Sequence, residues 1–483
     1  MVKVALIGAS DPLTELLHGR LEASPDVARC DRIVDRGPEM EVRLRSWESD
    51  AVVYAAASRG ARGHPDNADA DVVFAACRAA GVQRIVVLSS AAIHAPSHKH
   101  PGRVAETHAS ARSAADPLAA RWLELERAAQ KAFEPGQSML TILRPAAVLL
   151  RGTDDYFNRL LSRRWAITLA GHDPTLQFLS PEDLGAAVCR AVETSACGVF
   201  HIAPNGAIPW RKALRLARVR RLPAPRWMHR AVRAVAAPLG LAAPLHEVDR
   251  TRYSWTVSGD RARSKLDFSP RDSSAAAVVR LSPRAQRSRG GQARGATFDE
   301  FGLDAERIGG WRRRHIRFLH DAYWRVEVEG TRNLPRDGAG VMVGVHRGFM
   351  PFDGVMVVHD VVGATGRYPR FLIHPALVKF PFLANYMFKL GGIIACRENA
   401  DYVLQRDGLL AVFPEGIRGA FSLYRDAYRI SGFGRPDYVR LALRHRAPII
   451  PFVTVGSAEI FPIFKKVDWR WWERLTEWPC FPL

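Results

Sequence analysis

A histidine and an aspartate lie close together in the chain where a short apolar strand is expected to end. Residues 341–345 (VMVGV) are apolar and rich in valine, which predicts a buried strand, and Gly348 breaks it. Pro351 then favours the first turn of a helix, with Asp353 near its start. We expect Asp353 to point back at His346. A carboxylate that orients an imidazole makes it a general base for an alcohol that attacks an acyl carbon.

A second stretch, AVFPEGIRG, carries an acid, a glycine and a guanidinium in one predicted turn. Residues 409–413 are again strand-like, so Glu415, Gly416 and Arg418 follow a strand end. Arg418 can form a bidentate contact with a phosphate, and Gly416 lets the backbone approach a ligand closely. Both stretches also have structural interpretations. A histidine beside a strand is often a packed core group, aspartate is favoured in a first helical turn, and charged turns are common on surfaces.

The two stretches resemble the signature blocks of the glycerolipid acyltransferase superfamily, the lysophosphatidate and diacylglycerol acyltransferase-like enzymes. Two further blocks lie in family order, namely GGIIACRENA, which contains Arg397, and APIIPFVTVGSAE. The common histidine–aspartate spacing is shorter, but HRGFMPFD matches a branch with the pattern HxGxxPxD. The resemblance implies that His346 is the catalytic base and Asp353 its orienting group. It also implies that the acceptor head group binds at Glu415, Gly416 and Arg418, with Arg397 beside them.

This resemblance predicts a transferase that moves a fatty acyl group from acyl-CoA or acyl carrier protein to a glycerolipid hydroxyl, with no cofactor required. The resembling branch continues past the FPL segment at which this chain stops, so we expect a truncated acyltransferase domain. Two alternatives stay open: a catalytically inactive, membrane-associated binding or scaffold protein and, third, an NAD-dependent sugar epimerase or reductase.

The amino-terminal half alternates predicted strands and helices. Strands are expected at residues 2–7, 31–34, 51–55 and 84–88, the last preceded by a helix over 72–80, and leucines 13, 16, 17 and 21 share one face of another helix. This alternation predicts an α/β fold with a doubly wound, Rossmann-like parallel sheet. The carboxy-terminal half predicts a separate α/β domain.

The segments VALIGAS, SDAVVYAAAS, GVQRIVVLSSAAIH and MLTILRPAAVL resemble an extended short-chain dehydrogenase of the NAD-dependent epimerase type. The resemblance implies that Gly8 and Asp35 are remnants of a dinucleotide site. The family's glycine loop is GxxGxxG, whereas this chain places Asp11 and Thr14 at the second and third positions. An aspartate there opposes a pyrophosphate, so we expect weak NAD(P) binding or none.

The family's catalytic tyrosine and lysine also have no counterparts. Alignment on LELER places Leu118 and Trp122 at their positions, while Ser90 corresponds to the family's serine. Neither a leucine nor a tryptophan relays a proton, so we expect no active oxidoreductase in this half.

The length of 483 residues and the apolar fraction of 47% allow two to three domains. We expect an epimerase-like domain at 1–280, a basic flexible linker at 281–297 (arginines without acids), and an acyltransferase-like domain at 298–483. The formal charge, 69 − 49 = +20, favours anionic partners, and a tryptophan-rich, basic tail suits a membrane interface.

We therefore expect an anionic membrane surface as a partner and a cytoplasmic protein peripheral to the inner face of the membrane, because no apolar run reaches the ~20 residues that span a bilayer. No nucleic-acid motif is found, so nucleic acid is not expected as a partner. The six cysteines are scattered, which predicts free thiols. No metal site is expected, because the aspartate and histidine pairs lack ligand spacing.

Overall fold

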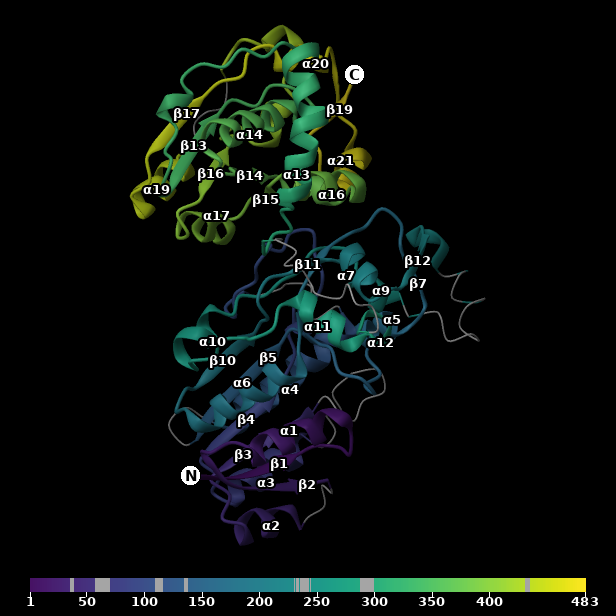
Figure 1. Cartoon of the computed structure of the whole chain (residues 1–483), viewed down its shortest axis with the longest axis vertical. Helices are drawn as coiled ribbons and strands as arrows, with labels where there is room; N and C mark the ends of the chain where they lie inside the picture. The colour runs from purple at the N-terminus through teal and green to yellow at the C-terminus, as the bar shows by residue number, and fades with distance from the viewer. Residues whose placement is uncertain are drawn as a thin grey trace. The chain divides into compact units, whose positions relative to one another are not determined.

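The computed structural model describes residues 1–34, 39–56, 70–108, 116–133, 138–229, 231, 234, 243, 245–286, 299–430 and 435–483. The chain forms two compact units (Figure 1). The first comprises Met1–Ser97 and Val104–Ala296, and the second comprises His98–Arg103 and Thr297–Leu483. No sequence pattern indicates that His98–Arg103, which lies in the amino-terminal half of the chain, belongs to the second unit.

The first unit is built on a sheet whose described strands all pair in parallel, in the order β10-β5-β4-β3-β1-β2. The strands are β1 (Val2–Ile7), β2 (Val27–Ile33), β3 (Ala51–Tyr54), β4 (Arg84–Leu88), β5 (Met139–Pro145) and β10 (Gly198–Ile202). Strands β1, β3 and β4 match the predicted ranges closely. Strand β2 begins four residues before its predicted start because it lies at the sheet edge, where its polar residues stay partly exposed.

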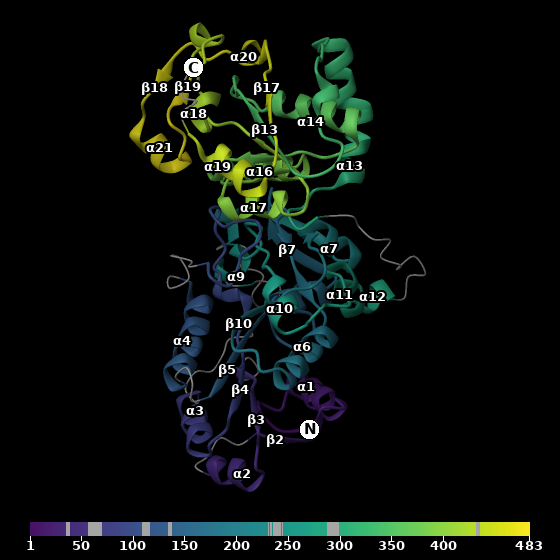
Figure 2. The ribbon, with the colours of Figure 1, turned by 90° about the vertical axis from the view of Figure 1, so that its left-hand side faces the viewer.

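Helices cover both faces of this sheet, which confirms the doubly wound fold. Figure 2 shows α1 (Pro12–Glu22) and α6 (Pro181–Glu193) on one side, and α3 (Ala70–Ala79) and α4 (Pro117–Ala132) on the other. Helix α2 (Met40–Ser46) packs beside α3. Successive residues of β1 alternate between the two cores, because side chains in a strand point to opposite faces.

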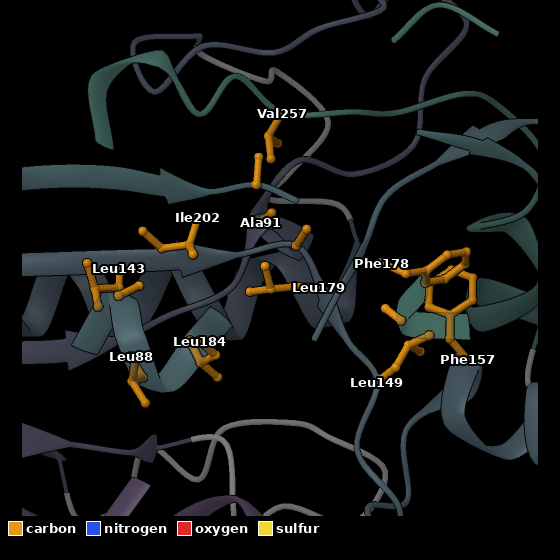
Figure 3. Close-up of a cluster of buried hydrophobic side chains, with 14 of the residues drawn as sticks. Leu88, Ala91, Leu143, Leu149, Phe157, Phe178, Leu179, Leu184, Ile202 and Val257 are labelled. Atoms are coloured by element: carbon orange, nitrogen blue, oxygen red, sulfur yellow. The ribbon is translucent and has the colours of Figure 1, made fainter. Parts of the chain in front are cut away.

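The larger core of the first unit joins the sheet to the elements that follow it. Figure 3 shows Leu88 and Leu143 of the sheet, Leu184 of α6, and the rings of Phe157 and Phe178 farther along. These later elements are α5 (Tyr156–Ser162), α7 (Trp210–Leu216), α9 (Leu245–Asp249), α10 (Asp260–Lys265), α11 (Ser274–Leu281) and the short strand pairs β6 (Ala147–Val148) with β9 (Phe178–Leu179), β7 (Trp165–Leu169) with β12 (Arg220–Ala224), and β8 (Thr175–Leu176) with β11 (Ile208–Pro209).

Residues 281–286, the first part of the expected flexible linker, are folded. Helix α12 (Pro283–Gln286) follows α11 directly, and Leu281, Ser282 and Ala285 are buried. The hydroxyl of Ser282 donates to the carbonyl of Ala217 at 2.8 Å. These small and apolar residues anchor the segment although arginines surround them. Residues 287–297 of the expected linker lie outside the described residues.

The second unit contains a parallel sheet with strand order β15-β14-β16-β13-β17 among its described residues. These strands are β13 (Gly340–Gly344), β14 (Arg370–Ile373), β15 (Gly392–Ile394), β16 (Leu409–Val412) and β17 (Ile449–Phe452). The predicted strands at 341–345 and 409–413 are therefore β13 and β16. They are hydrogen-bonded neighbours at the centre of the sheet, so the residues that follow them meet at one sheet edge.

Helices and turns that position the site follow these strands. They are α14 (Phe352–Thr365), α15 (Pro375–Val378), α16 (Pro381–Lys389), α17 (Arg397–Leu404), α18 (Ile417–Ala420), α19 (Asp437–His445) and α20 (Ser457–Ile460). Helix α13 (Ala305–Trp311) continues into the π-helical segments η5 (Arg312–Ile316) and η6 (Phe318–Tyr323), which pack on α14 through Ile316 and Leu319. The tail forms β18 (Lys466–Val467), α21 (Arg470–Thr476) and β19 (Phe481–Pro482).

Candidate active site

His346 and Asp353 form the predicted pair. His346 lies just beyond the end of β13, and Asp353 lies in the first turn of α14. The distance between His346 Nδ1 and Asp353 Oδ2 is 2.6 Å, and the second carboxylate oxygen accepts a hydrogen bond from the amide of Gly354 at 2.7 Å. With Nδ1–H donating to the buried carboxylate, Nε2 is the nitrogen that can accept a proton.

Charge around the imidazole stabilises its protonated form. Burial lowers the pKa of His346, but the charge and hydrogen bond of Asp353, together with the charge of Glu415, outweigh burial and raise the pKa above its ordinary value. The ring also stacks on Phe413, with ring centroids 4.8 Å apart. The base is therefore held in one orientation and one tautomer before any substrate arrives.

His346 lines a cavity of about 970 Å³. The walls are mainly apolar and come largely from α14, β14, α15, α16 and the turn after β16, with Val358, Phe371, Leu383 and Met387 among them. This volume lies at the upper end of the range of small-molecule sites, about 300–1,000 Å³. Such a lining suits a long apolar group better than a polar metabolite.

Glu415 does not face this cavity, which corrects its expected role in head-group binding. Its carboxylate accepts two hydrogen bonds from the Arg347 guanidinium, at 2.8 and 2.7 Å, and both side chains are buried. Arg347 also donates to the hydroxyl of Ser422 at 3.0 Å and to the carbonyl of Arg429 at 2.6 Å. Glu415 turns away from the cavity because a buried carboxylate needs a charged partner, and Arg347, the residue after His346, is that partner. This ion pair joins the two signature turns.

Gly416 lies on the cavity wall in a conformation that other residues rarely adopt. Its φ of 60° and ψ of −151° belong to a region occupied almost only by glycine. Gly419 is equally constrained, because a Cβ there would lie 2.8 Å from Glu415 Oε2 and 3.0 Å from the carbonyl oxygen of His346. The glycines let the turn pass close under the histidine.

Arg418 is exposed and is not among the residues that line the cavity, so its expected contact with a phosphate is not supported. Ile417 precedes it in the short helix α18 and faces the cavity, and the next helical residue points about 100° away. The other predicted arginine, Arg397, does line the cavity.

Three further arginines of the cavity wall were not predicted, namely Arg435, Arg440 and Arg444. Asp401 of α17 forms ion pairs with Arg397 at 3.5 Å and with Arg444 at 3.3 Å. The spacing of Arg440 and Arg444 places them on one face of α19, a sequence signal that could have indicated them. Asp437 also lines the cavity and pairs with Arg440 at 3.4 Å. The four arginines outnumber these two aspartates, so the cavity wall carries a net positive charge.

In the loop that resembles a dinucleotide site, polar groups of the chain pair with or pack against one another. Asp11 caps α1 and accepts a hydrogen bond from the amide of Thr14 at 2.7 Å. Thr14 is fully buried, and its Oγ1 would lie 2.6 Å from a Cβ placed on Gly8. Asp35 lies outside the described residues.

The residues at the family's catalytic positions have structural roles as well. Leu118 and Trp122 are buried in the face of α4 that packs on the sheet. The side chain of Ser90 accepts a hydrogen bond from the amide of Ala92 at 3.1 Å, at the start of a short 3-10 turn.

Comparison with known protein families confirms both resemblances. Residues 325–455 match the family model described as Acyltransferase, and residues 44–160 match the one described as NAD(P)H-binding. Residues 44–160 are therefore similar to NAD(P)H-binding domains, and residues 325–455 are similar to acyltransferase domains.

Curated relatives align over part of their length. An uncharacterized protein of Mycobacterium tuberculosis is 39% identical over 188 residues, which are 38% of this chain and 52% of that protein. A Bos taurus protein named DGAT1/2-independent enzyme synthesizing storage lipids is 26% identical over 166 residues, 34% of this chain and 49% of that protein. The chain spans about half the length of the curated relatives it matches.

Among solved structures, a UDP-glucose-4-epimerase from Stenotrophomonas maltophila with bound NAD aligns with a TM-score of 0.48 and 14% identity, over 59% of this chain and 98% of that chain. A UDP-N-acetylglucosamine 4-epimerase from Bacillus cereus aligns with a TM-score of 0.44 and 17% identity, over 59% of this chain and 100% of that chain.

Proposed function

We propose that the second unit transfers a fatty acyl group from a thioester, acyl-CoA or acyl carrier protein, to a glycerolipid hydroxyl. The observation that carries this proposal is the His346–Asp353 pair, held at 2.6 Å on the wall of a large apolar cavity. An oriented imidazole supplies the base, and the cavity suits an acyl chain. The acyltransferase family match of residues 325–455 supports the same reaction type.

The proposed reaction uses His346 in both halves. Nε2 accepts the proton of the acceptor hydroxyl while its oxygen attacks the thioester carbonyl carbon, and Asp353 stabilises the imidazolium that forms. Collapse of the tetrahedral intermediate breaks the carbon–sulfur bond, and the imidazolium returns the proton to the departing thiolate. The ester and the free thiol are the products, and no cofactor is required.

The arginines on the cavity wall suggest that one substrate is anionic near the reacting centre. Arg435, Arg440 and Arg444 can bind the phosphates of coenzyme A or a phosphate head group on the acceptor. Kinetics with a charged and an uncharged acceptor separate these possibilities, because a contact to coenzyme A affects both acceptors equally.

We further propose that the protein works at an anionic membrane surface. No helix among the described residues is long and apolar enough to cross a bilayer. In the tail, Phe464 is 71%, Trp471 54% and Leu475 64% exposed, and Lys465, Lys466, Arg470 and Arg474 lie beside them. Exposed rings and basic residues together favour the interface of an anionic bilayer. Sedimentation with vesicles of neutral or anionic lipid, at low and high salt, tests this: binding indifferent to lipid charge would contradict it.

The decisive experiment is direct. Purified protein is incubated with labelled acyl-CoA and with lysophosphatidate or diacylglycerol, and lipid products are separated. We expect a product in which the acceptor has gained one acyl chain, and no product with His346→Ala. A protein that binds both substrates but yields no product would instead support the inactive binding protein.

A further inference from the structure

A second cluster of chemically active side chains lies away from the catalytic pair. His320 of the π-helical segment η6 meets His359 and Asp360 of α14 where the two helical segments pack together. Potential ligand atoms of the three residues all lie within 4.8 Å of one another. From the sequence we expect no metal site, because the aspartate and histidine pairs lack ligand spacing. His320 is distant in the chain from His359 and Asp360, and only folding brings it beside them.

The distances suit a metal ion. His320 Nε2 lies 3.0 Å from Asp360 Oδ1, and the rings of His320 and His359 have centroids 5.0 Å apart. Zinc–nitrogen and zinc–oxygen bonds of about 2.0–2.1 Å in a tetrahedral site place neighbouring ligand atoms roughly 3.4 Å apart. Small side-chain rotations therefore suffice to bring all three groups onto one ion.

The orientation of His320 is set by another carboxylate. Its Nδ1 lies 2.7 Å from Asp321 Oδ1, while the other oxygen of Asp321 accepts from Arg317 Nε at 3.1 Å. If Nδ1–H donates to Asp321, the lone pair of Nε2 faces the Asp360 carboxylate. Two electron-rich atoms 3.0 Å apart need a cation between them, either a proton or a metal. A carboxylate behind a histidine is the usual second partner of a metal-bound imidazole.

Burial supports a ligand at this position. His359 Nδ1 is shielded from solvent, and no described residue forms a hydrogen bond with it. His320 Nε2 is also shielded, and the Asp360 carboxylate lies 3.0 Å from it. Such buried ring nitrogens normally have a partner.

We propose that His320, His359 and Asp360 bind a divalent transition metal of the zinc type, with water at the remaining position. Two nitrogens and one carboxylate oxygen match the ligand preferences of Zn²⁺ and its neighbours. Asp321 and Asp360 offset the guanidinium of Arg312, which also lies near this end of α14. The metal joins η6 to α14, the helix whose first turn holds Asp353, so its role is to hold that helix in place.

The test uses the full chain and metal alone. The protein is treated with a chelator, dialysed, and titrated with Co²⁺ while visible absorption is recorded, then with Zn²⁺ in competition. We expect one equivalent to bind and the melting temperature to rise. His359→Gln and Asp360→Asn should each weaken binding by roughly 100-fold or more, and Asp321→Asn by about 10–100-fold.

The matched control is His315→Ala, because His315 is an exposed histidine of the neighbouring π-helical segment η5. It should bind metal like the wild type. Each variant is checked by circular dichroism, and the two ligand variants provide independent tests if one fails to fold. Absence of saturable binding in the wild type, or binding unchanged in a folded ligand variant, would overturn the proposal. A proton would then be the cation between His320 and Asp360. The readout is binding, so it is independent of acyl transfer.

Discussion

The turn after β1 in the first unit and the turn after β16 in the second occupy equivalent positions, at the carboxyl end of a strand in a parallel sheet. Ligands commonly bind there. In the first turn the chain satisfies its own groups, because Asp11 caps α1 and Thr14 packs against Gly8. In the second, Glu415 pairs with Arg347 of the neighbouring turn after β13, and His346 of that turn remains on a cavity wall. A shared topology therefore provides a position for a site, and the residues that end the strand decide whether a site exists.

Loss of the base is expected to have the largest effect. His346→Ala should reduce acyl transfer by ~100 to 10,000-fold, because only the proton acceptor is removed. Initial rates with labelled acyl-CoA measure this effect. The control is His315→Ala, which should retain wild-type turnover, and both variants should melt like the wild type. Undiminished turnover in His346→Ala would show that the turn after β13 has no catalytic role, and the contrast with the first unit would be lost.

Asp353→Asn should be nearly as damaging, at roughly 100-fold or more, because the amide keeps the volume but no longer stabilises the imidazolium. The pH profile adds a sharper test. Since the pKa of His346 is raised, activity of the wild type should fall as pH drops through a value above the ordinary ~6.5. In the variant the charge that opposes burial is gone, so the acid limb should move to lower pH. An unmoved acid limb would mean that the limb belongs to another group.

Glu415→Gln distinguishes a structural from a substrate-binding carboxylate. It leaves the buried Arg347 guanidinium without a counter-charge, which typically costs about 3–5 kcal/mol. We expect a lower melting temperature of the second unit, measured by calorimetry. If the variant instead melts like the wild type and only its KM for the acceptor rises, the sequence-based role of Glu415 was correct.

Much of this arrangement could be predicted from sequence, because apolar strand runs and the turns after them are local signals. The ranges of β1, β4 and β16 and the His346–Asp353 pair follow from such signals. Which way a side chain points within a turn is not local. Glu415 and Arg418 belong to the same signature, yet tertiary contacts direct one to Arg347 and leave the other exposed. Arg435 and the cluster of His320 with Asp360 depend wholly on folding.

Arg435 and Arg418 form a natural pair for testing the charged part of the cavity. Arg435 lies beside Gly416 and lines the cavity, whereas Arg418 does not. Arg435→Ala should raise KM by about tenfold for the substrate that carries the phosphate, equivalent to one charge-assisted hydrogen bond. Arg418→Ala should leave KM unchanged. A larger effect with lysophosphatidate than with diacylglycerol assigns the contact to the acceptor, and an equal effect assigns it to coenzyme A. The reverse result for the two arginines would restore the sequence-based assignment.

The smallest expected effect concerns Asp11, and it tests whether the first turn has a structural role only. Asp11→Ala should lower the stability of the first unit by ~1 kcal/mol, because the amide of Thr14 loses its acceptor, whereas Asp11→Ser should restore most of that loss. Denaturant unfolding followed by circular dichroism measures both variants. Calorimetric titration with NAD and NADP should show no saturable binding to the wild type, because the carboxylate occupies the helix end that would receive a pyrophosphate. Asp11→Ser removes that charge but keeps Thr14 against Gly8, so it should not bind dinucleotide either. A micromolar dissociation constant for the wild type would show that the turn accepts phosphate despite its capping aspartate, and the contrast between the two strand ends would then be lost.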